Sequence, residues 1–261
     1  MTHNLSRLFY LSGDNKPINN ANDITFIKEI KIFNHNIPKL ISYESFYKVP
    51  LANSEFELTT IYPGLLIGAG YSHPALKKID NANSDEIGDF QLGFFFDHTT
   101  GLPVIPGSSV KGVLKSVFPK KNDKYLKQKL NYINEIITQN NNNNFINFDN
   151  WETVFFGNVA AKRRHIFFDA YISSLLENGR IFEEDYITPH TEDIFKNPNP
   201  IRFLKIGPNV KIKFQFYLCD YSDNHGNNLK KEIIAKVFKQ ILLDFGIGAK
   251  RNIGYGQFIE G

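Results

Sequence analysis

The C-terminal end of the chain combines glycines, two cations and an amide at a spacing that suits phosphate binding. The run Gly246-Ile-Gly-Ala-Lys-Arg-Asn-Ile-Gly-Tyr-Gly-Gln-Phe258 places four glycines, among them Gly248 and Gly254, around Lys250, Arg251 and Asn252. Glycine allows positive φ and close backbone approach, so such a loop can expose N–H groups beside its cations. The run matches neither the P-loop nor the dinucleotide-binding fingerprint. On its residues alone it is equally consistent with a helix exit or a hairpin.

A second candidate for anion binding lies in the run Gly101-Leu-Pro-Val-Ile-Pro-Gly-Ser-Ser-Val-Lys-Gly112. Ser108 or Ser109 is predicted to cap a short helix there, because serine oxygens accept hydrogen bonds from the first helical N–H groups. Lys111 and Lys115 follow one turn apart, away from the apolar face. The N–H groups and dipole of a helix start favour phosphates, and the lysines would add charge-assisted contacts. The alternative is that the serine only caps the helix and that the lysines are solvated.

Two loop histidines, His73 and His190, are the candidates for general acid–base catalysis of RNA cleavage. Histidine titrates in the pH range that such catalysis needs. Each of the two lies next to a proline, however, and a loop histidine in that setting more often has a structural or ligand-contacting role than a catalytic one. We therefore predict no catalytic residue.

The sequence does not indicate a metal or cofactor site. Its polar loop carries four aspartates without the spacing of a ligand set, namely Asp80, Asp85, Asp89 and Asp97. The single cysteine, Cys219, excludes a disulfide within the chain and a cysteine-based zinc site. We accordingly predict no metal and no cofactor.

The composition is that of a globular chain long enough to bury a sizeable core, with 42% hydrophobic residues among 261. The formal net charge of +3 is weakly basic, so it favours a nucleic-acid partner only if the cations are clustered. The aromatic content of 14% suits β-structure and base-stacking surfaces alike. No apolar run approaches a membrane span and no signal-peptide core is recognised, so a cytoplasmic location is expected.

Alternating and helical periodicities predict six elements that would position these residues. They are strands at about 56–60, 165–172, 210–218 and 253–259, and helices at 108–117 and 233–245. The first strand should bend at Pro63-Gly64, and Gly246 should be the C-cap of the second helix. The order strand, helix, strand, strand, helix, strand is that of an α+β, ferredoxin-like (RRM-related) split βαβ domain, with helices on one face of an antiparallel sheet.

The remaining segments are predicted to extend this domain. Residues 1–50 are interpreted as an N-terminal extension with a helix around Ile24 to Phe33, and residues 51–261 as the ferredoxin-like domain. An insertion is predicted at about 120–150, where a helix at 126–137 runs into a solvated asparagine loop, Asn140 to Asn144. Residues 201–206 are compatible with a further short strand.

Three stretches resemble the motifs of RAMP proteins, the backbone and capping subunits of type III CRISPR effectors. The run ending at Gly112 resembles their Pro-Gly-Ser-Ser-x-Lys-Gly signature, and the run beginning at Gly246 resembles their C-terminal glycine-rich loop. Between these, Phe155-Phe-Gly157 followed by Ile166-Phe-Phe-Asp-Ala170 resembles the usual middle segment. The resemblance extends from about residue 56 to the end of the chain.

Within that superfamily, the chain is most similar to the sixth subunit of the Cmr (type III-B) complex, with His73-Pro74 and Ile187-Thr-Pro-His190 as supporting features. The resemblance implies a ferredoxin-like, RNA-binding subunit near the 3′ part of the guide RNA. The partners that it implies are the guide RNA, the target RNA and other RAMP subunits of the complex. The residues predicted to contact RNA are Ser108, Ser109, Lys111, Lys115, Gly246, Gly248, Lys250, Arg251, Asn252, Gly254 and His73.

One departure from the family pattern concerns catalysis. RAMP subunits that cleave target RNA carry an aspartate in the loop ahead of the Pro-Gly-Ser-Ser motif. If Asp97 is aligned with the family's later loop position, Gln91 occupies the cleaving position, and an amide cannot act as a carboxylate. We therefore favour a non-catalytic RNA-binding subunit. The alternative is a RAMP endoribonuclease that processes repeat RNA or cleaves target RNA, with Asp89 supplying the carboxylate two residues away.

Overall fold

The protein is represented by a computed structural model that describes residues 48–67, 95–97, 102–120, 123–141, 151–158, 163–187, 201–222 and 227–261. Several predictions fall outside these residues and are not addressed by the structure. They concern the helix around Ile24 to Phe33 and the side chains of His73, Asp80, Asp85, Asp89, Gln91 and His190.

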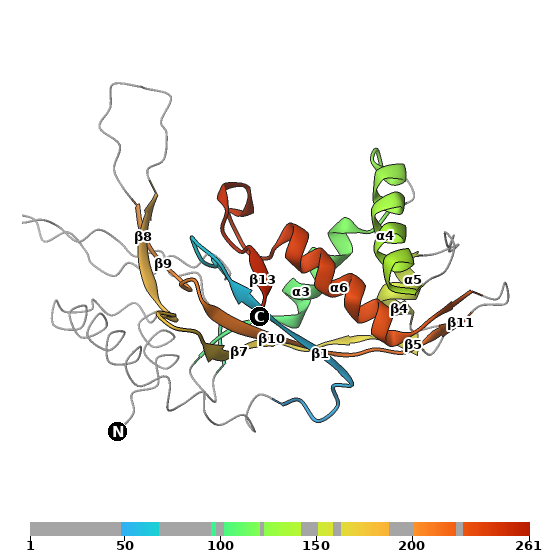
Figure 1. The fold of residues 1–261 in the computed structure, drawn as a ribbon, viewed down its shortest axis with the longest axis horizontal. Helices are drawn as coiled ribbons and strands as arrows, with labels where there is room; N and C mark the ends of the chain where they lie inside the picture. The colour runs from blue at the N-terminus through green and yellow to red at the C-terminus, as the bar shows by residue number, and fades with distance from the viewer. Residues whose placement is uncertain are drawn as a thin grey trace, which may run out of the picture.

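The largest sheet is antiparallel and has the strand order β13-β1-β10-β7-β3-β2 (Figure 1). Its bounds are β1 (Ser54–Thr60), β2 (Phe95–Phe96), β3 (Pro103–Ile105), β7 (Ala170–Leu175), β10 (Val210–Tyr217) and β13 (Phe258–Glu260). The short strand β6 (Ile166–Phe167) pairs with the end of β10. The central pair β1–β10 sets Leu58 opposite Ile212 and Phe56 opposite Phe214. This register follows from the alternation of apolar residues along both strands, because a shift by one residue would turn the apolar side chains of one strand away from the core.

Four helices of the described chain lie on one face of this sheet in Figure 1. They are α3 (Gly107–Val117), α4 (Leu126–Asn141), α5 (Trp151–Phe156) and α6 (Lys231–Phe245). Phe238 of α6 packs its ring against Phe216 of β10 and Phe155 of α5, at centroid distances of 5.7 and 6.1 Å. One contiguous apolar core therefore joins the helices to the sheet. The predicted α+β class, with an antiparallel sheet, is confirmed.

Three two-stranded ladders complete the described part of the chain. They are β4 (Gly157–Asn158) with β5 (Arg163–Arg164), β8 (Glu183–Ile187) with β9 (Ile201–Lys205), and β11 (Tyr221–Ser222) with β12 (Asn228–Leu229). The strand expected at 201–206 is β9, and its partner β8 was not predicted. Figure 1 shows the β8–β9 hairpin rising at one end of the sheet, beside the loop that follows α6.

The middle and last strands differ from their predicted bounds. The strand expected at 165–172 is interrupted at Phe168-Asp169, and Ile166, expected on one face with the residues that include Ala170 and Ile172, is 40% exposed while those two are buried. The strand expected at 253–259 begins only at Phe258. Residues Arg251–Ile253 form a short 3₁₀ helix instead, and Gly254 and Gly256 then take positive φ, which extended strand cannot accommodate.

The helices were predicted closely, with one side-chain exception and one boundary difference, and one side chain of strand β10 also departs from its expected face. Gly246 caps α6 as expected, with φ 63° and an N–H bond to the Leu242 carbonyl. Phe245, predicted to lie on the buried stripe of α6, is 41% exposed. Gln215, predicted on the outer face of β10, is fully buried. Asn140, predicted in a solvated loop, lies within α4 and donates from Nδ2 to the Ile136 carbonyl.

Helix α4 contributes to the main core, although its sequence lies in the predicted insertion. Ile133, Ile136 and Ile137 are buried there, and Tyr132 donates its hydroxyl to Asp244 of α6 at 2.6 Å. Burial and this hydrogen bond raise the pKa of Tyr132 well above its usual value. Within the residues described, no helix combines the length and apolarity that crossing a bilayer requires.

Candidate nucleic-acid interface

The start of α3 is capped by a carboxylate rather than by a serine. The N–H of Gly107 donates to Oδ1 of Asp169 at 2.8 Å, and the N–H groups of Ser109 and Val110 donate to the Pro106 carbonyl. Pro106 occupies the N-cap position, and neither serine side chain caps the helix. The prediction that Ser108 or Ser109 is the N-cap is therefore wrong. The break between β6 and β7 explains this, because it leaves Asp169 positioned at the helix start.

Gly107 lets α3 begin directly against the β6 segment. A Cβ at this position would lie 2.1 Å from the Phe167 carbonyl oxygen, so only glycine fits without a shift of backbone. Its neighbours Ser108 and Ser109 are exposed. The helix start thus presents two hydroxyl groups to solvent, while a negative charge already occupies the end of its dipole.

Both lysines of α3 contact other parts of the chain. The Lys111 ammonium lies 5.4 Å from the centroid of the Phe167 ring. The Lys115 ammonium forms an ion pair with Glu152 of α5, in which both side chains stay partly exposed. A surface ion pair of this kind is weak and can exchange partners. The lysines are consequently engaged but not buried.

The loop after α6 presents its cations differently. Lys250 adopts a left-handed conformation with φ 56°, the 3₁₀ turn Arg251–Ile253 follows, and Gly254 closes the turn with φ 97°. Lys250, Arg251 and Asn252 are all exposed. Within the described part of the chain, the structure records no acceptor for the backbone N–H groups of these three residues. This turn therefore offers two cations, an amide and free N–H groups on one surface segment.

The glycines of this loop serve mainly to fold it against the chain. The N–H of Ile247 donates to the Gly256 carbonyl at 2.9 Å, and the N–H of Gly256 donates to the Gly64 carbonyl at 2.8 Å. A Cβ at Gly256 would lie 1.8 Å from the Ile247 carbonyl oxygen, and one at Gly248 would lie 2.2 Å from the Leu66 carbonyl oxygen. The loop accordingly exposes fewer N–H groups than its glycine content predicts.

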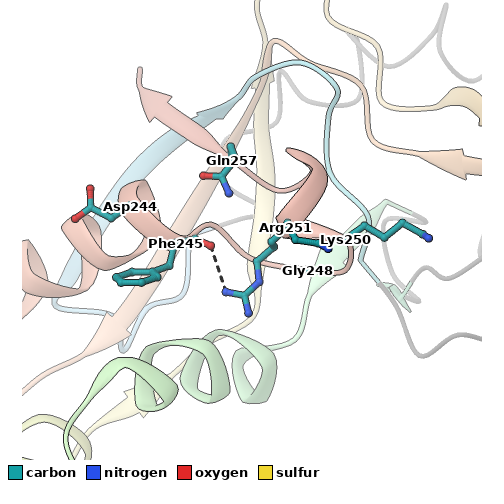
Figure 2. A pocket seen from close by; sticks show the side chains of 7 residues that line it. Asp244, Phe245, Gly248, Lys250, Arg251 and Gln257 are labelled. Carbon is teal, nitrogen blue, oxygen red and sulfur yellow. Dashed lines mark hydrogen bonds between the residues drawn. The ribbon is translucent and has the colours of Figure 1, made fainter. Parts of the chain in front are cut away.

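An open hollow beside this turn is lined by Asp244, Phe245, Gly248, Lys250, Arg251, Asn252 and Gln257. Figure 2 shows Arg251 reaching back toward the end of α6, where its Nη1 donates to the Phe245 carbonyl at 3.2 Å, while Lys250 extends the other way. The guanidinium has five N–H donors, so this bond leaves others available for an anion. The Asp244 carboxylate in the same hollow accepts hydrogen bonds from Tyr132 and Gln240, at 2.6 and 2.8 Å.

A network below the loop joins it to the β8–β9 hairpin. The Tyr255 hydroxyl donates to Oδ2 of Asp185 at 2.7 Å, and the Lys205 ammonium donates to the same oxygen at 2.8 Å. Burial is the main cause that raises the pKa of Tyr255, and the hydrogen bond to Asp185 raises it further. Burial also acts to raise the pKa of Asp185, but the hydrogen bonds from Lys205, Tyr255 and the Tyr186 N–H together hold that pKa below its usual value.

Sequence reasoning missed this network. In the sequence, Lys205 and Asp185 are ordinary charged residues, and the strand that carries Asp185 was not predicted, yet Lys205 is only 5% exposed. No local signal distinguishes Lys205 from Lys211 and Lys213 of β10, which are only partly buried. Tyr255 lies inside the glycine-rich run, and its aromatic ring between two glycines is the one feature that could have marked it as an anchor.

The two predicted halves of the interface remain separate in the described residues. Helix α3 packs against α6, but the structure records no hydrogen bond, ion pair or ring contact between Ser108, Ser109, Lys111 or Lys115 and the loop 246–254. His73 lies outside the described residues. No group of three histidine, cysteine, aspartate or glutamate side chains suited to a metal occurs in the part of the chain that the structure describes.

Comparison with known proteins identifies related chains. The model of the RAMP superfamily matches residues 57–259. The CRISPR system CMR subunit Cmr6 of Saccharolobus solfataricus is 26% identical over 173 residues, which are 65% of this chain and 49% of that relative. The chain thus spans about half the length of this curated relative.

Two solved structures are among those similar to this chain. A chain in the cryo-EM structure of the Type III-B Cmr-beta bound to cognate target RNA matches with 21% identity and a TM-score of 0.48, covering 99% of this chain and 87% of that one. The crystal structure of Cmr6 from Pyrococcus furiosus matches with 18% identity and a TM-score of 0.44, covering 80% of this chain and 97% of that one.

Proposed function

The chain belongs to the RAMP superfamily, and from that premise we propose that it is a non-catalytic RNA-binding subunit of a type III-B CRISPR ribonucleoprotein effector. In this role it holds guide and target RNA near the 3′ end of the guide, beside other RAMP subunits in the cytoplasm, for antiviral defence. The similarity to the CMR subunit Cmr6 supports the choice of complex. The function requires no cofactor and no metal.

The strand order supports the ferredoxin-like interpretation of the fold. The four strands β13-β1-β10-β7 with α3 after β1 and α6 after β10 follow the order of a split βαβ domain, and β3 and β2 extend its edge. RNA-binding domains of the RRM type share this order of elements. Here the helices cover one face, so RNA contacts are proposed for the loops at the helix ends rather than for the helical face.

The observation that carries the proposal is the exposed turn of Lys250, Arg251 and Asn252. Its two cations and free N–H groups suit phosphate oxygens, which are the same in every nucleotide. A subunit that must accept any guide sequence requires such backbone recognition. Gly246, Gly248 and Gly254 are proposed to shape this turn, and Ser108, Ser109, Lys111, Lys115 and His73 to supply further RNA contacts.

The alternative function is a RAMP endoribonuclease acting on repeat or target RNA. Incubation of the purified chain with labelled repeat and target RNA distinguishes the two functions. We expect both RNAs to stay intact. Cleavage that His73→Ala, His190→Ala or Asp89→Ala abolishes would overturn the non-catalytic assignment, because these are the candidate acid, base and carboxylate identified in the sequence.

RNA binding is tested by the double variant Lys250→Ala with Arg251→Ala. Each lost phosphate contact should reduce the magnitude of the slope of log affinity against log salt by about 0.7 for single strands. The slope of the double variant should therefore be shallower by about 1.4. Affinity should fall to a similar extent for RNAs of unrelated sequence. Fluorescence anisotropy of labelled single-stranded RNA over a range of salt concentrations measures both quantities.

The matched control is Lys124→Ala with Lys127→Ala, at the start of α4. Both lysines are exposed, and their removal changes the net charge by the same amount. We expect the control to change the affinity and salt slope much less. Equal effects of the two double variants would show that total charge, rather than this turn, governs binding.

A further inference from the structure

An exposed aromatic ring stands next to the glycine-rich loop and has no role in the core. Tyr62 is 81% exposed, the highest value among the exposed large hydrophobic side chains in the described residues. It precedes Pro63 and Gly64 in a tight turn, in which the Gly64 N–H donates to the Ile61 carbonyl at 2.7 Å. An isolated apolar side chain on a surface is ordinary. This ring, however, lies beside the glycine-rich loop and close to a buried cation.

The turn that carries Tyr62 is joined to the proposed RNA-binding loop. The Gly256 N–H donates to the Gly64 carbonyl, and the nearest atom to a Cβ at Gly254 would be Cδ of Pro63, at 3.4 Å. Gly254 closes the 3₁₀ turn that begins at Arg251. Pro63, which follows β1, therefore lies beside Gly254 at the end of the 3₁₀ turn, and Tyr62 is the residue directly before Pro63. Figure 1 shows the two segments together, beside the base of the β8–β9 hairpin.

A buried cation supports the ring from the protein side. The Lys205 ammonium lies 5.7 Å from the centroid of Tyr62 and 5.9 Å from that of Tyr255. Asp185 holds this ammonium at 2.8 Å, and Tyr255 donates to the same carboxylate. Cation–π attraction of this kind favours one placement of the ring. Lys205 is 5% exposed whereas Tyr62 is 81% exposed, so the ring has an inner side near the cation and an open outer side.

We infer that Tyr62 is a stacking platform for a nucleobase of single-stranded RNA, placed next to the phosphate-binding turn. This inference rests on the proposed function and adds the contact to a base that phosphate binding by Lys250 and Arg251 leaves open. Single-strand binding sites combine a cationic path for the backbone with aromatic rings on which bases stack. Stacking accepts every base, since each has a π-face, so it agrees with binding that tolerates any guide sequence. The Lys205–Asp185–Tyr255 network positions the platform and is not itself proposed to touch RNA.

The test compares Tyr62→Ala and Tyr62→Leu with Tyr62→Phe. We expect the first two to weaken binding of a short labelled single-stranded RNA about tenfold, because a stacked aromatic contributes roughly that much. Tyr62→Phe retains the ring and should bind like the parent. The salt slope should stay unchanged in all three, since no phosphate contact is lost. Abasic RNA of the same length should bind the parent and Tyr62→Ala equally, because it offers no base to stack.

Tyr125→Ala is the matched control. Tyr125 is 54% exposed, and the Lys124 ammonium lies 5.6 Å from its ring centroid, so it presents a similar pair of side chains at the start of α4. In Figure 1, α4 stands at the opposite end of the helical layer from the β8–β9 hairpin. This variant should not weaken binding. Thermal unfolding of every variant shows whether its fold is retained, and Tyr62→Leu keeps apolar bulk at the site if the alanine variant proves unstable.

The outcomes separate the two proposals. If the Tyr62 variants bind RNA like the parent while Lys250→Ala with Arg251→Ala binds weakly, the stacking platform is refuted and the phosphate-binding turn stands. An equal loss in Tyr125→Ala, or a loss in Tyr62→Ala that persists with abasic RNA, also refutes it. A parent protein that binds no RNA refutes the proposed function and the platform together.

Discussion

The two glycine- and lysine-bearing motifs of this chain have similar compositions, but the fold treats their polar groups differently. At the start of α3, the Gly107 N–H is taken by Asp169 and the Lys115 ammonium by Glu152. In the loop after α6, Lys250 forms no recorded ion pair within the described residues and is exposed, and Arg251 makes one bond, to the Phe245 carbonyl. Within the described residues, Lys115 is therefore paired with a carboxylate, whereas Lys250 and Arg251 are not.

The glycines of the two motifs also serve different ends. Gly107 allows a helix to start against a neighbouring strand, whereas Gly112 lies on the exposed side of α3, where an added Cβ would have no atom within 4 Å. Gly246, Gly248 and Gly256 combine positive φ with a backbone oxygen too close for any Cβ. The loop thus depends on its glycines, whereas of the two described glycines of the α3 motif only Gly107 is required by its surroundings.

The largest effect is expected on the free energy of unfolding when a glycine of the loop is replaced. Gly256→Ala should lower the free energy of unfolding by about 3–5 kcal/mol, because it adds a clash with the Ile247 carbonyl to a strained φ of 73°. Gly112→Ala is the control and should raise that free energy by about 0.5–1 kcal/mol, because alanine favours the helix. Chemical denaturation of both variants measures the difference. A Gly256→Ala protein as stable as the parent would mean that the loop is not held as described.

The next largest effect is expected for the two carboxylates that hydrogen-bond to these motifs, Asp169 at the start of α3 and Asp185 below the loop after α6. Asp185→Asn should lower the free energy of unfolding by about 2–3 kcal/mol at neutral pH, because it leaves the buried Lys205 ammonium without its nearest charge partner. Asp169→Asn should lower it by about 1 kcal/mol, because an amide can still accept the Gly107 N–H bond but loses the attraction to the helix dipole. Chemical denaturation at neutral pH measures both changes, and an Asp185→Asn protein no less stable than Asp169→Asn would contradict this order.

The pH dependence of stability checks the same point. The folded-state pKa of Asp185 lies below its unfolded value of about 3.9, so its contribution is complete above about pH 5 and is lost as the pH falls through the folded-state pKa. The parent should therefore lose stability between about pH 5 and pH 3 more steeply than Asp185→Asn. Parallel acid profiles for the two proteins would contradict the role given to this carboxylate.

The smallest effect is expected for RNA binding by α3. Lys111→Ala with Lys115→Ala should weaken RNA binding by less than Lys250→Ala with Arg251→Ala and should change the salt slope by less than about 1, because Lys115 is already paired and Lys111 lies over a ring. Anisotropy titrations of the two double variants, which lose the same net charge, make the comparison direct. A larger loss for the α3 pair would reverse the ranking of the two motifs.

Much of the fold follows from periodicity along the chain. The alternation from Val210 to Leu218 and the stripe of α6 from Ile233 to Leu242 predicted a strand and a helix that the structure confirms, because burial on one face imposes a period of two or 3.6 residues. Gly246 was recognisable as a helix end for the same local reason. The motifs at Gly107-Ser108-Ser109 and in the C-terminal loop also carried the family assignment.

The surroundings of the candidate site could not be read in this way. Asp169 caps a helix that begins 62 residues earlier, and Asp185 meets Tyr255 across 70 residues. Such pairs arise only when strands and loops pack together, and a carboxylate or an ammonium looks the same in the sequence whether it ends up paired, buried or solvated. The sequence by itself therefore determined most of the elements, the family and the composition of the turn proposed to bind phosphate. Tertiary packing alone decided that Lys205 is buried, that α3 begins on a carboxylate, and that Tyr62 stands exposed beside the turn.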